Sequence, residues 1–427
     1  FFRPPVTMAG VKLDSKLDFL APSAQCIKPV QTKRKPVRLD SETTSIIDEV
    51  ALKEAVKVSL NDCLACSGCV TTAESILVQE QSIEEVYKQL TENKEMEKRG
   101  ERPRKLVASV APQACASIAA YFRCPLMEAF QKLTWVLQSR LGVSVVMDTV
   151  WAQNVSLLEI SREFVDRYRR HQQDGAASPM PMLASACPGW ICYAEKTHPG
   201  LIPLISTAKS PQAVLGTVVK RYFAQQWGLA MDAIYHLSIY ACYDKKLEAT
   251  RDDFKVDGVR ETDCVIAASE VVDLLKREEL EWAAIPLAPV GDHVATYLSE
   301  EMAQWDETSE FESSGGYLEF VMRYAAKELF GHTIQGPLSY KQRRNPNWQE
   351  VSLEVDGQKV LVFAIAYGFQ QIQNVTRQIS GKTKAKCAYH FVEVMACPSG
   401  CLNGGAQIKA SAQQTEETNK DLLKRVE

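Results

Sequence analysis

The stretch that decides the fold runs from Glu393 to Gly405 and reads EVMACPSGCLNGG. It begins within a short apolar run, Phe391 to Ala396, which is typical of a buried strand and ends directly at Cys397. Cys401 follows four residues later, so one helical turn would place both thiols on the same side. The closing Asn-Gly-Gly lets backbone approach closely and offers N–H donors to sulfur. The stretch therefore predicts a strand that delivers two cysteines to a metal or redox site.

The same ending recurs at two other apolar runs. Met182 to Ala186 leads into Cys187, and His236 to Ala241 leads into Cys242. Ligands in open α/β folds bind outside the carboxyl ends of the strands, so the cysteines at these three ends are expected to meet. Together with Cys397 and Cys401 they match the thiolate count of one 4Fe–4S cluster. Four small buried residues would be the alternative, but the repeated placement at strand ends favours a metal centre.

Further short apolar runs complete the pattern and define the fold class. They are Leu106 to Val110, Val143 to Met147, Cys264 to Ala267 and Val360 to Ala366. Helical patterns lie between most of these runs, which predicts an α/β protein with largely parallel sheets flanked by helices. A charged helix is expected from Ser82 to Lys98, followed by a basic linker up to Lys105. The expected domains are residues 1–105, 106–232 and 233–427.

A second cysteine motif lies near the start of the chain. Cys63, Cys66 and Cys69 are separated by two-residue gaps, which lets one tight loop wrap three thiolates around a cluster, as in bacterial ferredoxins. The fourth cysteine of the ferredoxin run is replaced by Ala73, so the fourth ligand must be remote, and Cys26 is the nearest unassigned candidate. A Cys₄ zinc site is the main alternative, and the spacing favours a cluster over it.

Composition narrows the class of protein. Hydrophobic residues make up 46% and charged residues 24% of the 427 residues, which is ordinary globular composition. The longest apolar run, Val360 to Phe369, is about half the ~20 residues that a membrane-spanning helix needs. The net charge of −4 gives no overall electrostatic attraction for nucleic acid. No secretory signal is visible, so the thirteen cysteines are expected to be reduced and available for metal.

The remaining cysteines have no ligand-like spacing among themselves, and buried structural thiols are expected. They are Cys115, Cys124, Cys192, Cys264 and Cys387. The six histidines form no HExxH pattern, and no Rossmann G-x-G-x-x-G or GxSxG motif is present. The cysteine motifs therefore carry the functional signal.

Three stretches resemble the active-site signatures of iron-only hydrogenases. They are residues 184–190 (ASACPGW), 241–248 (ACYDKKLE) and 393–405. Residues 205–212 (ISTAKSPQ) and 314–319 (SGGYLE) resemble further family segments, and the resemblance covers roughly Leu106 to Gln407. It implies an iron-only-hydrogenase-like fold, with two lobes, a cluster at their interface and a small N-terminal cluster-binding domain.

The chain departs from the hydrogenases where those enzymes move protons. Hydrogenases carry two adjacent cysteines before Pro-Gly-Trp, and the first, which relays protons, is Ala186 here. The methionine two residues before the second signature's cysteine is Tyr240, and one of two relay glutamates is Ile160. Alanine and isoleucine cannot transfer protons. Because Glu163, Lys245 and the cluster cysteines are kept, the resemblance implies a preserved cluster site without hydrogenase chemistry.

That combination is similar to the eukaryotic iron-only hydrogenase-like proteins of cytosolic iron–sulfur assembly. The similarity extends to the Cys63 motif, to residues 185–196 and to Cys26 with its following Ile-Lys-Pro. It implies two 4Fe–4S clusters. One is held by Cys26, Cys63, Cys66 and Cys69, and the other by Cys187, Cys242, Cys397 and Cys401.

The resemblance also implies a function and partners. It predicts a non-catalytic adaptor or carrier that links early cluster assembly to a targeting complex serving cytosolic and nuclear apoproteins. The partners would be a WD40 propeller protein, a MIP18-type protein and a HEAT-repeat adaptor, with no direct nucleic acid and no membrane. The location would be cytoplasmic, with the nucleus as a second compartment. The alternatives are a nuclear prelamin A-binding interaction protein, an active iron-only hydrogenase, disfavoured by Ala186 and Tyr240, and a structural zinc protein.

Overall fold

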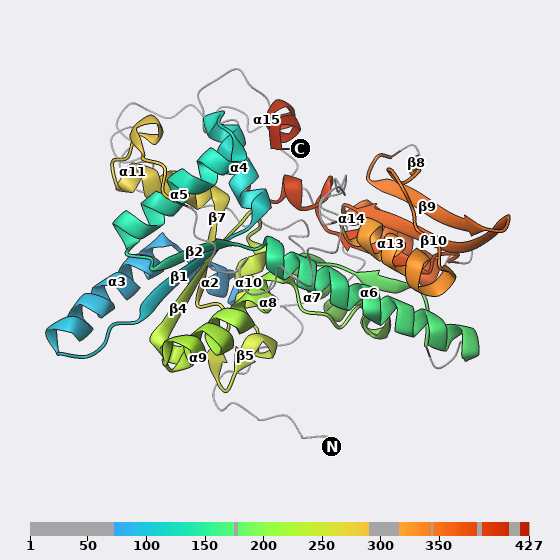
Figure 1. The fold of residues 1–427 in the computed structure, drawn as a ribbon, viewed down its shortest axis with the longest axis horizontal. Helices are drawn as coiled ribbons and strands as arrows, with labels where there is room; N and C mark the ends of the chain where they lie inside the picture. Colours follow the sequence, from blue (N-terminus) through green and yellow to red (C-terminus); the bar gives the residue numbers. More distant parts are fainter. Residues whose placement is uncertain are drawn as a thin grey trace, which may run out of the picture.

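The computed structural model describes residues 72–174, 178–289, 316–342, 345–381, 387–409 and 419–426. Within them the chain forms a four-stranded and a five-stranded sheet, each packed against helices, and a small two-stranded ribbon (Figure 1). The predicted α/β class with mostly parallel sheets is confirmed. Residues 1–71 lie outside the described part, and with them Cys26, Cys63, Cys66 and Cys69.

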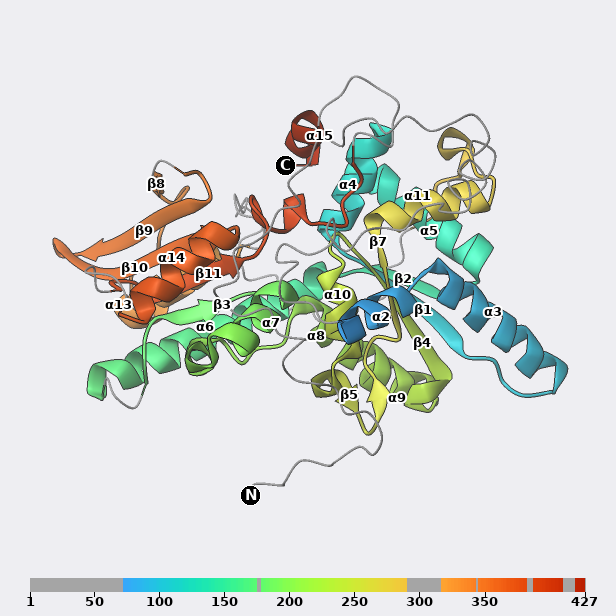
Figure 2. The same cartoon turned by 180° about the vertical axis from the view of Figure 1, so that it is seen from behind.

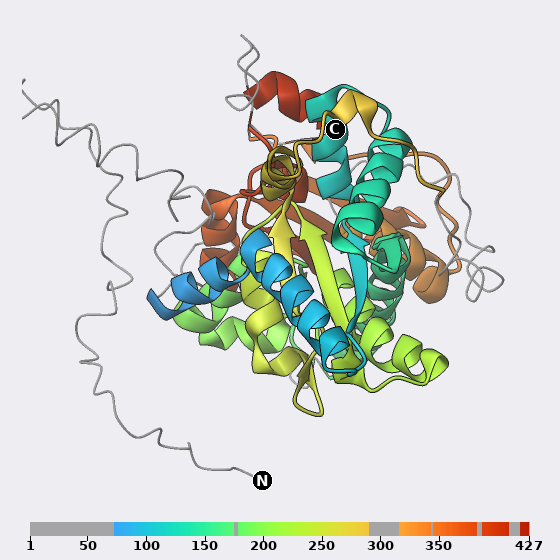
Figure 3. The same ribbon diagram turned by 90° about the vertical axis from the view of Figure 1, so that its left-hand side faces the viewer.

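The first sheet is entirely parallel and has the order β2-β1-β4-β7. Its strands are β1 (Lys105–Val110), β2 (Val145–Asp148), β4 (Ile234–Tyr240) and β7 (Cys264–Ala267). Helices cover both faces (Figure 3). One face packs against α3 (Ile83–Lys98), α4 (Pro112–Phe122), α5 (Leu126–Leu141) and α11 (Ala268–Arg277). The other packs against α8 (Pro211–Thr217), a π-helical turn (Val218–Phe223), α9 (Ala224–Trp227) and the start of α6 (Val150–Gln173).

The sequence of β1 explains why this sheet is buried on both sides. Leu106, Ala108 and Val110 lie in the core beneath α4 and α5, whereas Val107 lies in the core beneath α8. Side chains alternate across a strand, so an uninterrupted apolar run gives both faces something to pack against. The helix α6 then continues from the first sheet to the second, because its Ala152 belongs to the first core and its Phe164 to the second.

The second sheet has the order β3-β11-β10-β9-β8 and is parallel only through its first three strands. Its strands are β3 (Met182–Ala184), β8 (Lys341–Gln342), β9 (Trp348–Val355), β10 (Gln358–Tyr367) and β11 (Phe391–Met395). The helices packed around it are α6, α7 (Pro188–Thr197), α13 (Tyr317–Phe330) and α14 (Phe369–Ile379) (Figure 2). Its core is aromatic: Phe164 lies 5.0 Å, centroid to centroid, from Phe363.

Two hairpins add antiparallel strands that the sequence analysis missed. The strands β9 and β10 are joined at Asp356 and Gly357, which have φ of 52° and 75°. Positive φ at both residues suits the tight turns that connect antiparallel strands, and Asp-Gly is a strong signal for them. Because β9 contains polar residues, it is not a continuous apolar run and was not predicted as a strand. The ribbon of β5 (Lys255–Val256) and β6 (Val259–Arg260) turns in the same way, with positive φ at Asp257 and Gly258.

The strands predicted from apolar runs are all present, with small shifts at their ends. The sheets, however, draw strands from both sides of residue 232: β1 and β2 pair with β4 and β7, and β3 pairs with β11. Ile83 and Val86 of α3 also pack in the first core. The division into 1–105, 106–232 and 233–427 therefore does not follow the two sheets, and as a division into folding units it stays a prediction.

The smaller elements connect these layers. They are α2 (Thr72–Glu80), α10 (Asp244–Thr250), α15 (Asn419–Val426) and the 3₁₀ turns η3 (Pro199–Leu204), η5 (Met231–Ala233), η6 (Asp252–Phe254), η7 (Trp282–Ala284) and η8 (Gly400–Asn403). Buried Gln81, just after α2, donates from Nε2 to the carbonyl of Lys246 at 2.5 Å, and its own carbonyl accepts from Lys246 Nζ at 2.7 Å. In the described part of the chain no helix combines the length and the apolar character that crossing a membrane requires.

Candidate metal centre

Three strand ends from the two sheets carry the predicted cysteines. Cys187 follows β3 and caps the N-terminus of α7, and Cys242 follows β4 just before α10. Cys397 follows β11, and Cys401 lies in the turn η8. Parallel strands place their carboxyl ends at one edge, and here the edges of the two sheets face each other. The four cysteines therefore come from both lobes.

Cys187 is buried, the other three cysteines are partly buried, and the four thiols are close enough to influence one another's charge. Burial, then nearby Asp244, raises the pKa of Cys187 to about 11. Burial, then Cys187, raises the pKa of Cys401 to about 12. Burial raises the pKa values of Cys242 and Cys397 well above the usual value, and neighbouring cysteines of the set add to the rise in both. Thiolates at this site are unfavourable until a positively charged group is bound among them.

Backbone groups at the site favour sulfur in its charged form. Backbone hydrogen bonds at Ala396 and Trp190 lower the pKa of Cys187, and one at Gly405 lowers that of Cys397. None of the four cysteines is in a disulfide. N–H donors aimed at free, buried sulfur are what iron–sulfur clusters use to tune their ligands.

Two glycines allow the cysteine segments to pack against each other. A Cβ atom at Gly404 would lie 2.1 Å from the carbonyl oxygen of Ala241, the residue before Cys242. A Cβ atom at Gly189 would lie 2.4 Å from Asp244 Oδ2. Both distances are far below van der Waals contact, so only glycine lets these loops close around the site. The N–H of Ala406 donates to the same Ala241 carbonyl at 3.0 Å.

The donor set fits a 4Fe–4S cluster, for which four thiolates is the usual ligand count. Around one tetrahedral zinc the sulfurs would lie within about 4 Å of one another. Within the described residues no three His, Cys, Asp or Glu side chains are grouped as ligands of a single metal ion. The four thiols influence one another's charge, and their number matches the ligand count of one 4Fe–4S cluster.

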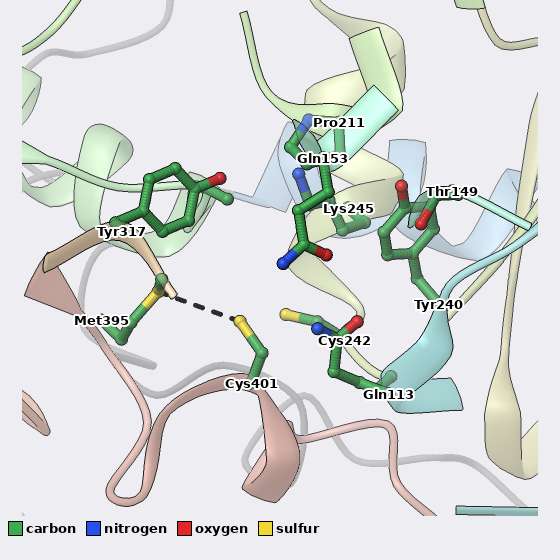
Figure 4. A pocket seen from close by; sticks show the side chains of 12 residues that line it. Gln113, Thr149, Gln153, Pro211, Tyr240, Cys242, Lys245, Tyr317, Met395 and Cys401 are labelled. Carbon is green, nitrogen blue, oxygen red and sulfur yellow. Dashed lines mark hydrogen bonds between the residues drawn. The ribbon is translucent and has the colours of Figure 1, made fainter. Parts of the chain in front are cut away.

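A cavity adjoins Cys242 and Cys401 (Figure 4). It encloses about 530 Å³ of space, including its opening to solvent. Its walls come from both lobes and are formed by Gln113, Thr149, Gln153, Ala186, Pro211, Tyr240, Ala241, Cys242, Lys245, Tyr317, Met395 and Cys401. Met395 Sδ lies 3.8 Å from Cys401 Sγ, as the dashed line in Figure 4 shows. The cavity therefore shares Cys401 with the thiol centre.

Two of the three residues at which the chain departs from hydrogenases line this cavity. Ala186 and Tyr240 both form part of its wall. Burial keeps the pKa of Tyr240 well above its usual value, so the hydroxyl stays protonated. Lys245 Nζ is buried and pairs with Glu248 Oε2 at 2.7 Å. Alanine at position 186 has no proton to relay.

The residue matched to a hydrogenase relay glutamate is held by other contacts. Glu163 accepts hydrogen bonds from Arg167 at 2.6 Å, from Ser206 Oγ at 2.5 Å and from the Thr207 N–H at 3.0 Å. Ile160, at the other relay position, is buried in the core of the second lobe. Glu163 therefore anchors the loop that follows η3 and has no titratable side chain beside it at position 160.

Asp244 belongs to the site, although the sequence analysis did not single it out. Its side chain is 1% exposed, and burial raises its pKa to about 7. It also raises the pKa values of Cys187 and Cys242. Its position two residues after Cys242, at the start of α10, was the available signal. By contrast, Cys115 and Cys264, expected to be structural, donate to the backbone carbonyls of Leu126 and Ser82 at 3.6 and 3.8 Å.

Fold and site together define an iron-only hydrogenase fold with a cysteine-lined centre between its lobes. The family model described as "Iron only hydrogenase large subunit, C-terminal domain" matches residues 104–405, and the chain belongs to this family. Solved structures agree: apo FeFe-hydrogenase HydA1 from Chlamydomonas reinhardtii superposes with a TM-score of 0.62 at 27% identity, over 76% of this chain and 84% of that one. The predicted hydrogenase-like fold is thereby confirmed.

The most informative relatives are not named as hydrogenases. The chain is 47% identical to "Cytosolic Fe-S cluster assembly factor narfl" of Xenopus tropicalis, over 96% of this chain and 85% of that protein. It is 45% identical to "Cytosolic iron-sulfur assembly component 3" of Mus musculus, over 95% and 85%. It is 40% identical to "Protein NAR1" of Arabidopsis thaliana, over 98% and 86%. The predicted branch of the family is thereby confirmed.

Proposed function

We propose that this protein is a non-catalytic iron–sulfur protein of cytosolic iron–sulfur assembly, acting as an adaptor or carrier. The observation that carries the proposal is the pairing of four neighbouring thiols with a cavity in which Ala186 stands at the position of the hydrogenase relay cysteine. The names of relatives that are 40% to 47% identical support it. The chain would hold two 4Fe–4S clusters and work in the cytoplasm and nucleus.

In this proposal Cys187, Cys242, Cys397 and Cys401 hold the second cluster, and Cys26, Cys63, Cys66 and Cys69 hold the first. A bound cluster supplies positive iron that stabilises the buried thiolates. The chain's own residues exclude water through burial, orient the sulfurs through the backbone around Ala396 and Gly405, and close the loops at Gly189 and Gly404.

Because the second set of thiols comes from both lobes, metal occupancy is coupled to the packing of one lobe against the other. That coupling gives a physical route by which cluster loading changes the surface offered to partners. The proposed partners are a WD40 propeller protein, a MIP18-type protein and a HEAT-repeat adaptor. Equal affinity of metal-free and loaded protein for these partners would contradict the route.

The decisive experiment is metal analysis of anaerobically purified protein, with electron paramagnetic resonance after reduction. About eight iron and eight sulfide per chain are expected for two 4Fe–4S clusters. Zinc without sulfide would overturn both clusters and leave a structural metal site. Hydrogen evolution by the loaded protein would overturn the non-catalytic assignment, and capture of processed lamin tails in place of assembly partners would favour the prelamin-binding alternative.

A further inference from the structure

The helix α15 packs directly against the turn that carries Cys401. It lies between α4 and η8, and Figure 1 shows it beside α4. Leu422 and Val426 are 4% and 9% exposed, and they form a small apolar cluster with Ala120, Ala116 and Leu402. Residues four apart lie on one face of a helix, so a single face of α15 makes this contact. Leu402 is the residue next to Cys401, and the contact therefore reaches the backbone of a proposed cluster ligand.

Hydrogen bonds tie the residues that follow this turn to α4. Gln407 Nε2 donates to the carbonyls of Gln113 and Leu402, at 3.1 and 3.0 Å. The N–H of Ile408 donates to Ser117 Oγ at 3.1 Å. Since α4 belongs to the first lobe and η8 follows a strand of the second, the turn bridges the lobes. Both these bonds and α15 hold the turn.

Cys401 is the ligand at which a loosened turn would matter most. Its sulfur lies 3.8 Å from Met395 Sδ and borders the cavity that opens to solvent. A shift of η8 would move this sulfur away from the other three and would widen the path for water. Leu422 packs against Ala116 and Ala120, two small side chains of α4. Their small size lets α15 lie close to α4.

We propose that α15 is a latch that holds the Cys401 turn in its ligating position and so controls how long the second cluster is retained. Leu422 and Val426 are positioning residues, which act on Cys401 through Leu402. The proposal rests on the proposed second cluster. Because coupling between two events is reciprocal, a bound cluster also favours the docked helix, and whatever engages α15 changes cluster retention.

The test compares three variants of the full chain, loaded anaerobically. Leu422→Asp places a charge in the apolar contact, Leu422→Met keeps an apolar side chain, and Lys424→Asp places the same new charge on the exposed face of the same helix. The measurement is the rate of iron release to a chelator. The Cys66→Ala substitution is added to each variant to remove the proposed first cluster. The iron released then comes from the proposed second cluster.

We expect Leu422→Asp to release iron about tenfold faster. This corresponds to a decrease of about 1.4 kcal/mol in the activation free energy of release. Leu422→Met and Lys424→Asp should release it at the wild-type rate. If Leu422→Asp cannot be purified, Leu422→Ala takes its place and is expected to accelerate release in the same direction. Release at the wild-type rate from both Leu422→Asp and Leu422→Ala would overturn the latch.

A second readout does not depend on substitution. Amide hydrogen exchange at residues 419–426 should be slower in the loaded protein than in the metal-free protein, because the two events are coupled. Equal exchange in the two forms would also overturn the latch. Wild-type protein that holds no iron and no sulfide would instead contradict the proposed function, so the two failures are distinguishable.

Discussion

The strands β4 and β11 occupy equivalent places in the two lobes but bury opposite kinds of titratable group. Each lies between two parallel neighbours, and each ends just before a cysteine of the centre. Burial lowers the pKa of His236 in β4 to about 4 and raises the pKa of Glu393 in β11 to about 7. Both groups are driven toward their neutral form.

The difference between these strands implies opposite responses to pH. The first lobe is weakened when acid protonates His236, and the second when base ionises Glu393. The cysteines at the two strand ends are shared by one centre, so the centre should be most stable between the two limits.

The largest expected effect follows from removing a strand-end cysteine in either lobe. Cys242→Ala and Cys397→Ala should each lower iron and sulfide to about half, because each removes one ligand of the proposed second 4Fe–4S cluster. The buried Cys264 of the adjacent β7 provides a matched control, and Cys264→Ala should keep full iron. If only one of the two strand-end variants lost iron, the lobes would not share a centre.

The next effect concerns Glu393, which accepts from Tyr367 Oη at 2.7 Å and from the Leu318 N–H at 2.8 Å. Its pKa is raised from 4.5 to about 7, so its contribution to stability is full below pH 4.5 and is lost as pH rises through 7. The loss amounts to about 3 kcal/mol over that window.

Glu393→Gln should remove this dependence, since the amide stays neutral and its oxygen can still accept. The measurement is the free energy of unfolding in denaturant between pH 5 and 8. Glu354→Gln, at an exposed position of β9, should leave the wild-type dependence intact. A Glu393→Gln protein with the wild-type pH slope would show that Glu393 is not the titrating group.

Protonation of His236 should lower the free energy of unfolding at acid pH. Its pKa is lowered from 6.5 to about 4, so its contribution is full above pH 6.5 and is lost as pH falls through 4. Between pH 6.5 and 5 the free energy of unfolding should fall by about 1.5 kcal/mol on this account. His236→Gln should flatten this region, while His332→Gln, at an exposed position, should not. If His236→Gln and wild type lost the same free energy of unfolding between pH 6.5 and 5, His236 would not be the titrating group.

The smallest expected change in unfolding free energy concerns the polar contacts of β4. Ser109 Oγ lies 2.8 Å from Ser238 Oγ and 3.0 Å from His236 Nε2. Ser238→Ala should cost about 1 kcal/mol of unfolding free energy, because it removes one buried hydrogen bond. Ser144→Ala, at an exposed position before β2, is the control and should be neutral. No loss in Ser238→Ala would indicate that the Ser109 hydroxyl is satisfied by His236 alone.

Much of the fold could be read from apolar runs, and β9 shows the limit of that approach. A strand packed on both faces is continuously apolar, as β1 and β4 are, and such runs are visible in the sequence. The β9 strand is only partly buried, with exposed Glu354 and intermediate Gln349. Its hairpin turn at Asp356 and Gly357 was the readable signal, since that pair favours positive φ.

Some residues of the site could likewise be predicted from the sequence, and others could not. Cys187, Cys242 and Cys397 could be selected because each follows an apolar run, and Cys401 because it lies four residues after Cys397. Ala186 and Tyr240 could be recognised as departures from the hydrogenase pattern. Asp244 could not be separated from ordinary helix-start aspartates, because its burial depends on segments far away in the chain, such as the one at Gly189 that lies against its carboxylate. The contact of Leu422 with Leu402 likewise joins residues that no sequence pattern connects.

The sequence by itself determined which sulfurs are available, which strands deliver them and which relay groups are absent, because these depend on residue type and local spacing. The tertiary structure decided that strands of two different sheets end at one place, that burial shifts His236 and Glu393 toward their neutral forms, and that α15 contacts the Cys401 turn. The physical reason is that burial and charge depend on what packs around a residue, and that packing comes from segments far apart in the chain.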